Sequence, residues 1–201
     1  MTLKEIAPIV ISLLALVVSS LTAYLTLLAR FQGYILPRHR AVLTQIKGIP
    51  CLVLECEFVN LGAKPGAIED LLVNAFDEQG NRVIFTPFLT TDKFNVFQNY
   101  ESNDFSIFSG ISLGVKERRE IFVVFRPSQT DFKPSEGIMY LQINMCVNIS
   151  RKNWEKSQIK FSLDLKTENI QEWISPSGKP QQISAVEISQ SRRAFLQKNQ
   201  K

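Results

Sequence analysis

The sequence predicts a mainly β protein, with one N-terminal transmembrane helix followed by an antiparallel β-sandwich of about eight strands. Two observations support this fold class. A long apolar run lies near the start of the chain, and short runs of alternating apolar and polar residues then extend from Ala41 to Leu165. Turn residues separate these runs, and no long helical period interrupts them, which favours an antiparallel sandwich over alternating strands and helices.

The apolar run extends from Ile6 to Ala29 and holds no charged residue between Glu5 and Arg30. As a helix it would be about 36 Å long, enough to cross a bilayer core of about 30 Å. It is longer than the apolar core of a cleaved signal peptide, and it runs directly into Arg30 and Phe31. We therefore expect an uncleaved anchor.

Small and hydroxylated residues recur along one face of this predicted helix at alternating spacings of three and four. In lipid, such residues let two helices approach closely, so they predict a helix-packing seam. Alternatively, the hydroxyl groups bond to the carbonyls four residues earlier in the same helix. The seam consists of Ser12, Ala15, Ser19, Thr22, Thr26 and Ala29.

Basic residues without acidic ones follow the run, from Arg30 to Lys47. Because excess Lys and Arg stays cytoplasmic, we expect a single-pass protein of the inner (plasma) membrane with its large domain in the cytoplasm. An extracellular or periplasmic domain remains open, since the rule weakens for long domains. The residues expected at the membrane surface are Arg30, Arg38, His39 and Arg40. His39, the only histidine, is expected there as a surface residue.

These features predict four regions: an anchor (1–30), a basic juxtamembrane segment (31–40), a sandwich domain (41–174) and a basic tail (175–201). The net charge of +4 is concentrated in the two flanks, which favours a membrane surface over nucleic acid. Cys51 and Cys56 lie five apart in one expected strand and point to opposite faces. With Cys146 they are expected to be buried thiols.

The expected strands cover 41–47, 51–59, 68–76, 82–85, 105–113, 120–126, 138–149 and 158–165, with an edge strand at 183–188. Between them, an irregular polar segment from Thr86 to Asp104 carries four aromatic residues. We expect these residues to pack against the core, although they could form an exposed partner-binding edge. They are Phe88, Phe94, Phe97 and Tyr100.

Two short motifs carry a resemblance. Phe58-Val-Asn-Leu-Gly62 closes a strand, and Ser112-Leu-Gly114 precedes the strand Ile121 to Phe125. Together they resemble immunoglobulin-like sandwich modules of bacterial cell-envelope proteins. The arrangement is also similar to uncharacterised bacterial proteins with one N-terminal span and such a module. The resemblance implies an immunoglobulin-like fold and no particular activity.

Catalytic and metal-binding motifs give no complete set. Gly110-Ile-Ser112-Leu-Gly114 matches G-x-S-x-G, but no histidine follows it in the chain to activate the serine. We therefore expect no enzyme, no cofactor and no metal. The expected role is that of an accessory or assembly subunit of a membrane complex. Its expected partners are the lipid bilayer and another membrane protein or a second copy of the chain. The alternative is a membrane-anchored module that senses or binds glycan, peptide or lipid.

Overall fold

The computed structural model describes residues 3–24, 30–93, 104–129, 132–147, 154–155, 161–175, 179–184 and 186–187. In these residues the chain is mainly β, as predicted, with two helices, α1 (Leu3–Ala23) and α2 (Thr167–Ile174). The strands are β1 (Gly33–Ile46), β2 (Ile49–Asn60), β3 (Gly66–Ile68), β4 (Asp70–Phe76), β5 (Arg82–Thr91), β6 (Ser106–Ile107), β7 (Ile111–Leu113), β8 (Arg118–Pro127), β9 (Gly137–Cys146), β10 (Trp154–Glu155), β11 (Phe161–Leu165), β12 (Gln181–Ser184) and β13 (Val186–Glu187).

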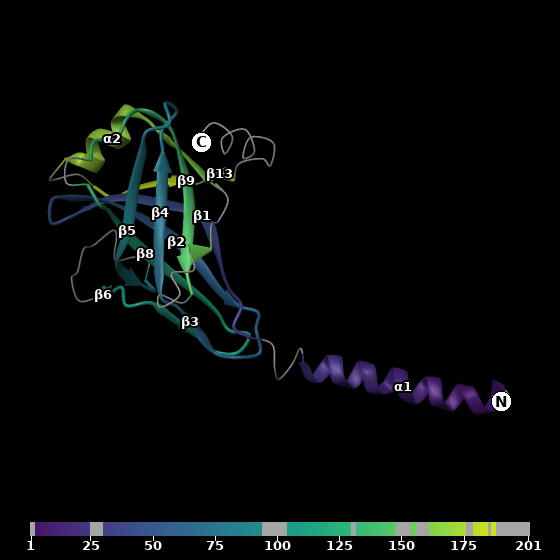
Figure 1. The fold of residues 1–201 in the computed structure, drawn as a ribbon. Coiled ribbons are helices and arrows are strands. Elements are labelled where there is room, and N and C mark those ends of the chain that lie inside the picture. Colours follow the sequence, from purple (N-terminus) through teal and green to yellow (C-terminus); the bar gives the residue numbers. More distant parts are fainter. Residues whose placement is uncertain are drawn as a thin grey trace.

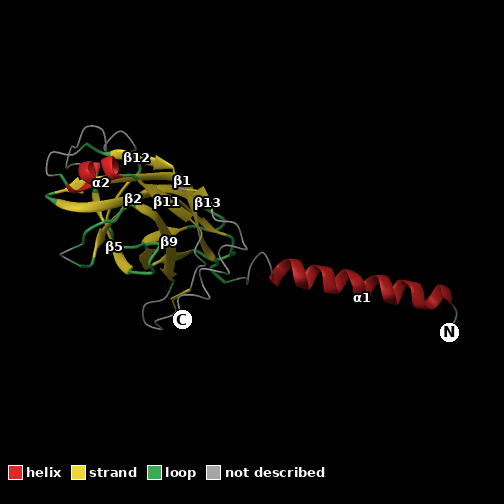
Figure 2. Cartoon of the chain, turned by 90° about the horizontal axis from the view of Figure 1, so that it is seen from above, coloured by secondary structure: helices red, strands yellow, loops and turns green. Residues whose placement is uncertain are grey.

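Eleven of these strands form one antiparallel sheet in the order β12-β1-β2-β8-β5-β4-β9-β11-β13, with β10 on β9 and β6 on β5. The sheet curls until its two ends approach, and β11 contacts β12 (Figure 2). The result is a nearly closed, barrel-like sheet rather than two separate facing sheets. The short pair β3 and β7 forms a second sheet. We refer to residues 30–187 as the β domain.

The interior of the curled sheet holds the main hydrophobic core. Alternate residues of each strand point inward, as the pleat requires, so that β4 contributes Leu71, Val73 and Ala75. Two strands away in the sheet, β8 contributes Ile121, Val123 and Phe125. Burial of this apolar surface is the main force that holds the strands together.

A smaller apolar cluster lies on the outer face of β1, β2 and β8. It comprises Val42, Ile46, Cys51, Val53, Phe122 and Val124, covered by Phe88, Leu89 and Phe105. The strands β2 and β8 therefore have buried side chains on both faces, although they belong to an antiparallel sheet. This cluster explains why the apolar runs in these strands are nearly continuous.

Several elements differ from the sequence-based expectation. β1 begins at Gly33 instead of Ala41, and a two-residue turn of Lys47 and Gly48 joins it to β2. Both turn residues have positive φ, 53° and 78°, which is the geometry of the tight hairpin that fits the twist of a sheet. Helix α2 was not predicted, because its eight residues are shorter than the window of about 11 residues over which a helical period can be recognised.

Helix α1 extends away from the β domain (Figure 1). Residues 25–29, the end of the predicted transmembrane run, lie outside the described residues. Within the part of the chain that is described, no helix is both long enough and apolar enough to cross a membrane. The helix itself was expected, and its insertion in a membrane stays a prediction.

Candidate functional site

The two ends of the β domain differ, and each offers a candidate site. We call the end from which α1 departs the near end; it includes the turns at 61–65 and 114–117. The far end lies at the opposite pole, where β4 ends and α2 lies (Figure 1). It includes the turn at 77–81 and the segment 132–135.

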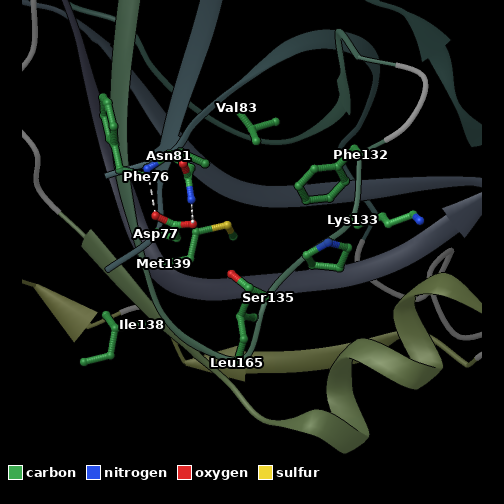
Figure 3. A pocket seen from close by; sticks show the side chains of 12 residues that line it. Phe76, Asp77, Asn81, Val83, Phe132, Lys133, Ser135, Ile138, Met139 and Leu165 are labelled. Carbon is green, nitrogen blue, oxygen red and sulfur yellow. Dashed lines mark hydrogen bonds between the residues drawn. The ribbon is translucent and has the colours of Figure 1, made fainter. Parts of the chain in front are cut away.

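A cavity of about 250 Å³ opens at the far end, between the β4–β5 turn, the segment 132–135 and the strands β9 and β11 (Figure 3). Its wall is largely apolar, with few polar groups at the mouth, as is typical of small-molecule sites. The lining residues are Ala75, Phe76, Asp77, Asn81, Val83, Phe132, Lys133, Pro134, Ser135, Ile138, Met139 and Leu165.

Two polar side chains of this cavity, Asp77 and Asn81, are hydrogen-bonded to each other in the β4–β5 turn. Asp77 accepts hydrogen bonds from the backbone N–H and the side-chain amide of Asn81, at 2.8 and 2.7 Å. Gly80 completes the turn at a φ of 85°, which favours glycine. Lys133 is directed away from Asp77 in Figure 3. The cavity therefore offers apolar contact and shape more than a fixed charge.

Phe132 forms one wall of the cavity and belongs to an aromatic stack. Its ring meets Phe85 edge-to-face with centroids 5.2 Å apart, and it meets Trp173 of α2 in the same manner at 5.5 Å. Trp173 is fully buried and donates its indole N–H to the carbonyl oxygen of Cys51, at 3.0 Å. The stack thus closes the far end of the curled sheet and fixes α2 against β2.

Phe132 also lines a second hollow, of about 470 Å³. This hollow is more polar than the first and includes Arg126, whose guanidinium carbon stands 4.9 Å from the centre of the Phe88 ring. The lining residues are Gly48, Ile49, Pro50, Thr86, Arg126, Pro127, Ser128, Gln129 and Phe132. One aromatic side chain is therefore shared by two hollows, and sequence reasoning found neither.

The near end is closed by hydrogen bonds of one buried residue, Asn60. Its side-chain amide donates to the carbonyl oxygens of Lys64 and Gly114, at 2.8 and 2.7 Å. Its side-chain oxygen accepts the backbone N–H groups of Gly62 and Gln32, at 2.8 and 3.3 Å. Asn60 therefore joins three segments that are distant in the sequence.

Gly62 lies against the start of the β domain. A Cβ atom at this position would lie 2.0 Å from the carbonyl oxygen of Arg30, so only glycine fits. The motif Phe58-Val-Asn-Leu-Gly62, noted in the sequence, thus holds residues 30–32 against the end of the sheet.

The predicted helix-packing seam is partly described. Ser12, Ala15, Ser19 and Thr22 lie in α1, whereas Thr26 and Ala29 lie outside the described residues. The hydroxyl groups of Ser12 and Thr22 donate to the carbonyl oxygens of Pro8 and Val18, each at 2.8 Å. This is the local bonding that the sequence allowed, and the hydroxyl oxygen of Ser12 can also accept a bond from a second helix.

The residues predicted at the membrane surface lie at different heights on the β domain. Arg30 is exposed at the near end, while Arg38 and Arg40 lie in the middle of β1. Arg38 pairs with Glu57 at 3.1 Å and with Glu120 at 2.5 Å, and Arg40 pairs with Glu55 at 3.6 Å. His39 lies between them in β1. Their role at a membrane stays a prediction.

Of the aromatic residues expected in an irregular segment from Thr86, Phe88 lies instead in β5, which continues to Thr91, and it packs on the outer apolar cluster. Phe94, Phe97 and Tyr100 lie outside the described residues.

The G-x-S-x-G motif has no catalytic context. Gly110 precedes the strand β7, in which Ser112 is exposed and opposite Ala67 of β3. A hydrolase elbow requires a helix after the serine, and here a turn follows. Among the described residues, no group of three His, Cys, Asp or Glu side chains could hold a metal ion.

The three cysteines are buried and free. Cys51 belongs to the outer apolar cluster and Cys56 to the inner core, so they do point to opposite faces. Burial raises the pKa of both thiols from 9.0 to about 12. Such thiols are poor nucleophiles and serve the packing of the sheet.

Comparison with known proteins adds no functional assignment. The chain matches no protein-family model, no curated protein and no solved structure.

Proposed function

We propose that the protein is a non-catalytic accessory or assembly subunit of a membrane complex, anchored by α1 and binding its partner through the β domain. The observation that carries this proposal is the exposure of α1. Its large apolar side chains from Ile9 to Tyr24 are 48 to 66% exposed, and the helix stands apart from the β domain.

The chemistry of α1 favours lipid as its surroundings. A helix that docks on a water-soluble partner has an apolar stripe and a charged or polar face. From Pro8 to Tyr24 the helix carries no charge on any face, and in the sequence the uncharged run continues to Ala29. We propose that this longer run, of which residues 25–29 lie outside the described ones, is inserted in the inner (plasma) membrane.

The β domain fits a binding role because its two ends are fixed by buried contacts, at Asn60 and at Trp173. A rigid framework with connecting loops is a common basis for partner recognition. The basic residues after α1 favour a cytoplasmic β domain, and a protease-accessibility assay on sealed vesicles of each orientation tests this placement.

The direct experiment is purification of the carboxy-terminally tagged full chain from its native membrane in mild detergent, followed by mass spectrometry of proteins recovered at fixed stoichiometry. A stable membrane partner is the expected result. Recovery of the protein alone, at several mild detergent conditions, would contradict a subunit role.

A pair of variants tests the seam. Ala15→Leu with Ser19→Leu enlarges the seam and should release the partner while the protein remains in the membrane fraction. The matched control is Val10→Leu with Val17→Leu, which adds bulk on the face away from the seam. If both pairs retain the partner equally, the seam is not the interface.

The cavity at the far end favours a second candidate function, a membrane-anchored module that binds a small apolar ligand. Val83→Phe would fill this cavity, whereas Glu78→Gln changes only the neighbouring turn. Titration of the detergent-solubilised full chain with a fluorescent apolar probe should show saturable binding that the first variant abolishes and the second retains. Binding that survives Val83→Phe would place the probe elsewhere and remove the cavity from consideration.

A further inference from the structure

Two exposed apolar residues stand at the tips of neighbouring turns at the near end. Leu61 is 54% exposed in the turn after β2, and Val115 is 52% exposed in the turn before β8. Each would be better placed in an apolar environment, by roughly 25 cal/mol per Å² of surface removed from water. Their position, rather than their exposure alone, makes them informative.

Hydrogen bonds hold the two turns together. The side-chain amide of Asn60 donates to the carbonyl oxygen of Gly114, and its backbone N–H donates to that of Glu117, at 2.7 and 2.9 Å. The backbone N–H of Leu61 donates to the carbonyl oxygen of Gln32, at 3.0 Å, two residues after the described chain resumes at Arg30. Both tips are therefore fixed beside the point where the chain arrives from α1.

Basic residues accompany the apolar tips. Lys64 and Lys116 are exposed in the same two turns, and in the described part of the chain neither has an ion-pair partner. Glu117, the acidic residue of the second turn, accepts the backbone N–H of Gly114 with its carboxylate at 2.5 Å and keeps its negative charge. Lys64, Lys116 and the exposed Arg30 outnumber this one carboxylate, so the surface is apolar at its tips with an excess of positive charge around them.

We propose that the near end of the β domain rests on the surface of an anionic lipid bilayer, with Leu61 and Val115 among the acyl-chain boundary and Lys64 and Lys116 against lipid phosphates. This inference rests on the proposed insertion of α1. Apolar tips with surrounding lysines suit an interface, because the apolar groups enter the boundary while the ammonium groups remain at headgroup level.

The geometry distinguishes these turns from the arginines of β1. Arg38 lies about 16 Å along β1 from Gly33, at roughly 3.3 Å per strand residue. Its guanidinium and that of Arg40 already pair with carboxylates of the sheet. A bilayer that holds α1 therefore meets the turns at 61–65 and 114–117 first, and these turns set the distance between the β domain and the membrane.

The experiment uses the full chain in lipid nanodiscs with single reporter cysteines. Leu61→Cys and Val115→Cys carry an environment-sensitive fluorophore at the near end, Glu78→Cys carries it at the far end, and Val17→Cys reports on α1. The three native thiols are buried, so they react slowly at neutral pH. Nanodiscs of phosphatidylcholine with phosphatidylglycerol contain spin-labelled lipids as quenchers.

We expect strong quenching at positions 61, 115 and 17, and none at position 78. Lys64→Glu combined with Lys116→Glu should reduce quenching at position 61 at least severalfold, and the thermal unfolding temperature should stay unchanged because both side chains are exposed.

Two other outcomes separate the inference from the proposed function. Quenching at position 17 without quenching at positions 61 and 115 would show that α1 is inserted but that the near end does not touch the bilayer. Absence of quenching at position 17 would contradict the insertion of α1 in the membrane. Quenching at position 61 that is indifferent to the lysine changes would overturn the assignment to anionic lipid.

Discussion

The near end and the far end of the β domain are closed by different kinds of interaction. At the near end, the side chain of Asn60 bonds to backbone groups of Gln32, Gly62, Lys64 and Gly114. At the far end, the rings of Phe85, Phe132 and Trp173 pack edge-to-face. The first closure is polar and directional, and the second is apolar.

This difference decides where space remains. A carboxamide that bonds four backbone groups draws the turns together until only glycine fits at position 62. Aromatic rings are large and rigid, so they leave hollows beside them, and Phe132 lines two such hollows here. The near end is therefore suited to hold a fixed position, and the far end is suited to admit a ligand or a partner side chain.

Removal of Trp173 should have the largest effect on stability. Trp173→Ala deletes a fully buried indole and should lower the free energy of unfolding by about 3 to 5 kcal/mol. Trp173→Phe keeps most of the packing but loses the bond to the Cys51 carbonyl, so it should cost about 1 to 2 kcal/mol. Denaturant unfolding followed by circular dichroism measures both. Equal losses for the two variants would show that packing contributes little here.

Asn60→Ala tests the near end and should lower the free energy of unfolding by about 2 to 3 kcal/mol, because buried backbone groups lose their partner. The control is Asn81→Ala, in an exposed turn of the far end, which should cost less than about 1 kcal/mol. The same denaturant titration compares them. If Asn81→Ala lowered the free energy of unfolding as much as Asn60→Ala, the hydrogen bonds of Asn60 would contribute no more to stability than those of an exposed turn.

The buried thiols give a pH-dependent prediction. Because burial raises the pKa of Cys51 and Cys56 to about 12, the folded state keeps both protons where the unfolded state, near 9.0, loses them. The contribution of each protonated thiol to the free energy of unfolding is thus fully present below pH 9. It is lost between about pH 9 and 12, at about 1.4 kcal/mol per pH unit.

Unfolding free energies measured from pH 8 to 11 should fall less steeply in Cys56→Ala than in the unaltered protein. Other groups titrate in this range, so the difference between the two slopes is the quantity to compare. Identical slopes would show that the Cys56 thiol does not contribute.

The smallest effect concerns the outer face of the sheet. Arg38→Met removes the pairs with Glu57 and Glu120 and should cost at most about 1 kcal/mol, less at high salt. Arg119→Met is the control, since Arg119 enters no ion pair among the described residues. If both variants lower the free energy of unfolding equally, the ion pairs of Arg38 contribute nothing to stability. Its guanidinium could then bind lipid at the membrane surface, as the sequence suggested.

The sequence predicted the elements whose signals are local. Alternation in Leu52, Leu54, Cys56 and Phe58 predicted both the strand β2 and the side chains that enter the core. The mainly antiparallel architecture followed from such runs and the short turns between them. The early part of β1 was not predicted, because Arg38 and Arg40 were interpreted as a basic segment at the membrane surface. In the structure, these arginines pair with glutamates of β2 and β8 on the outer face of the sheet.

The cavities and the two closures could not be predicted in the same way. Trp173 is 122 residues from Cys51 in the chain, and no local pattern indicates that their groups meet. Asn60 was noted in a motif, but its partners Gln32 and Gly114 are distant from it in the sequence. Both features depend on how the sheet curls, which is a property of the whole domain.

The pairing of β12 with β1 sets an order of events during synthesis. Ala41 lies opposite Ile183, so β1 receives its second neighbour only after all the strands from β2 to β12 have left the ribosome. At typical elongation rates this delay is on the order of ten seconds. Until then β1 pairs with β2 alone and presents an open edge, a ready site for a chaperone or for misassembly with another nascent chain.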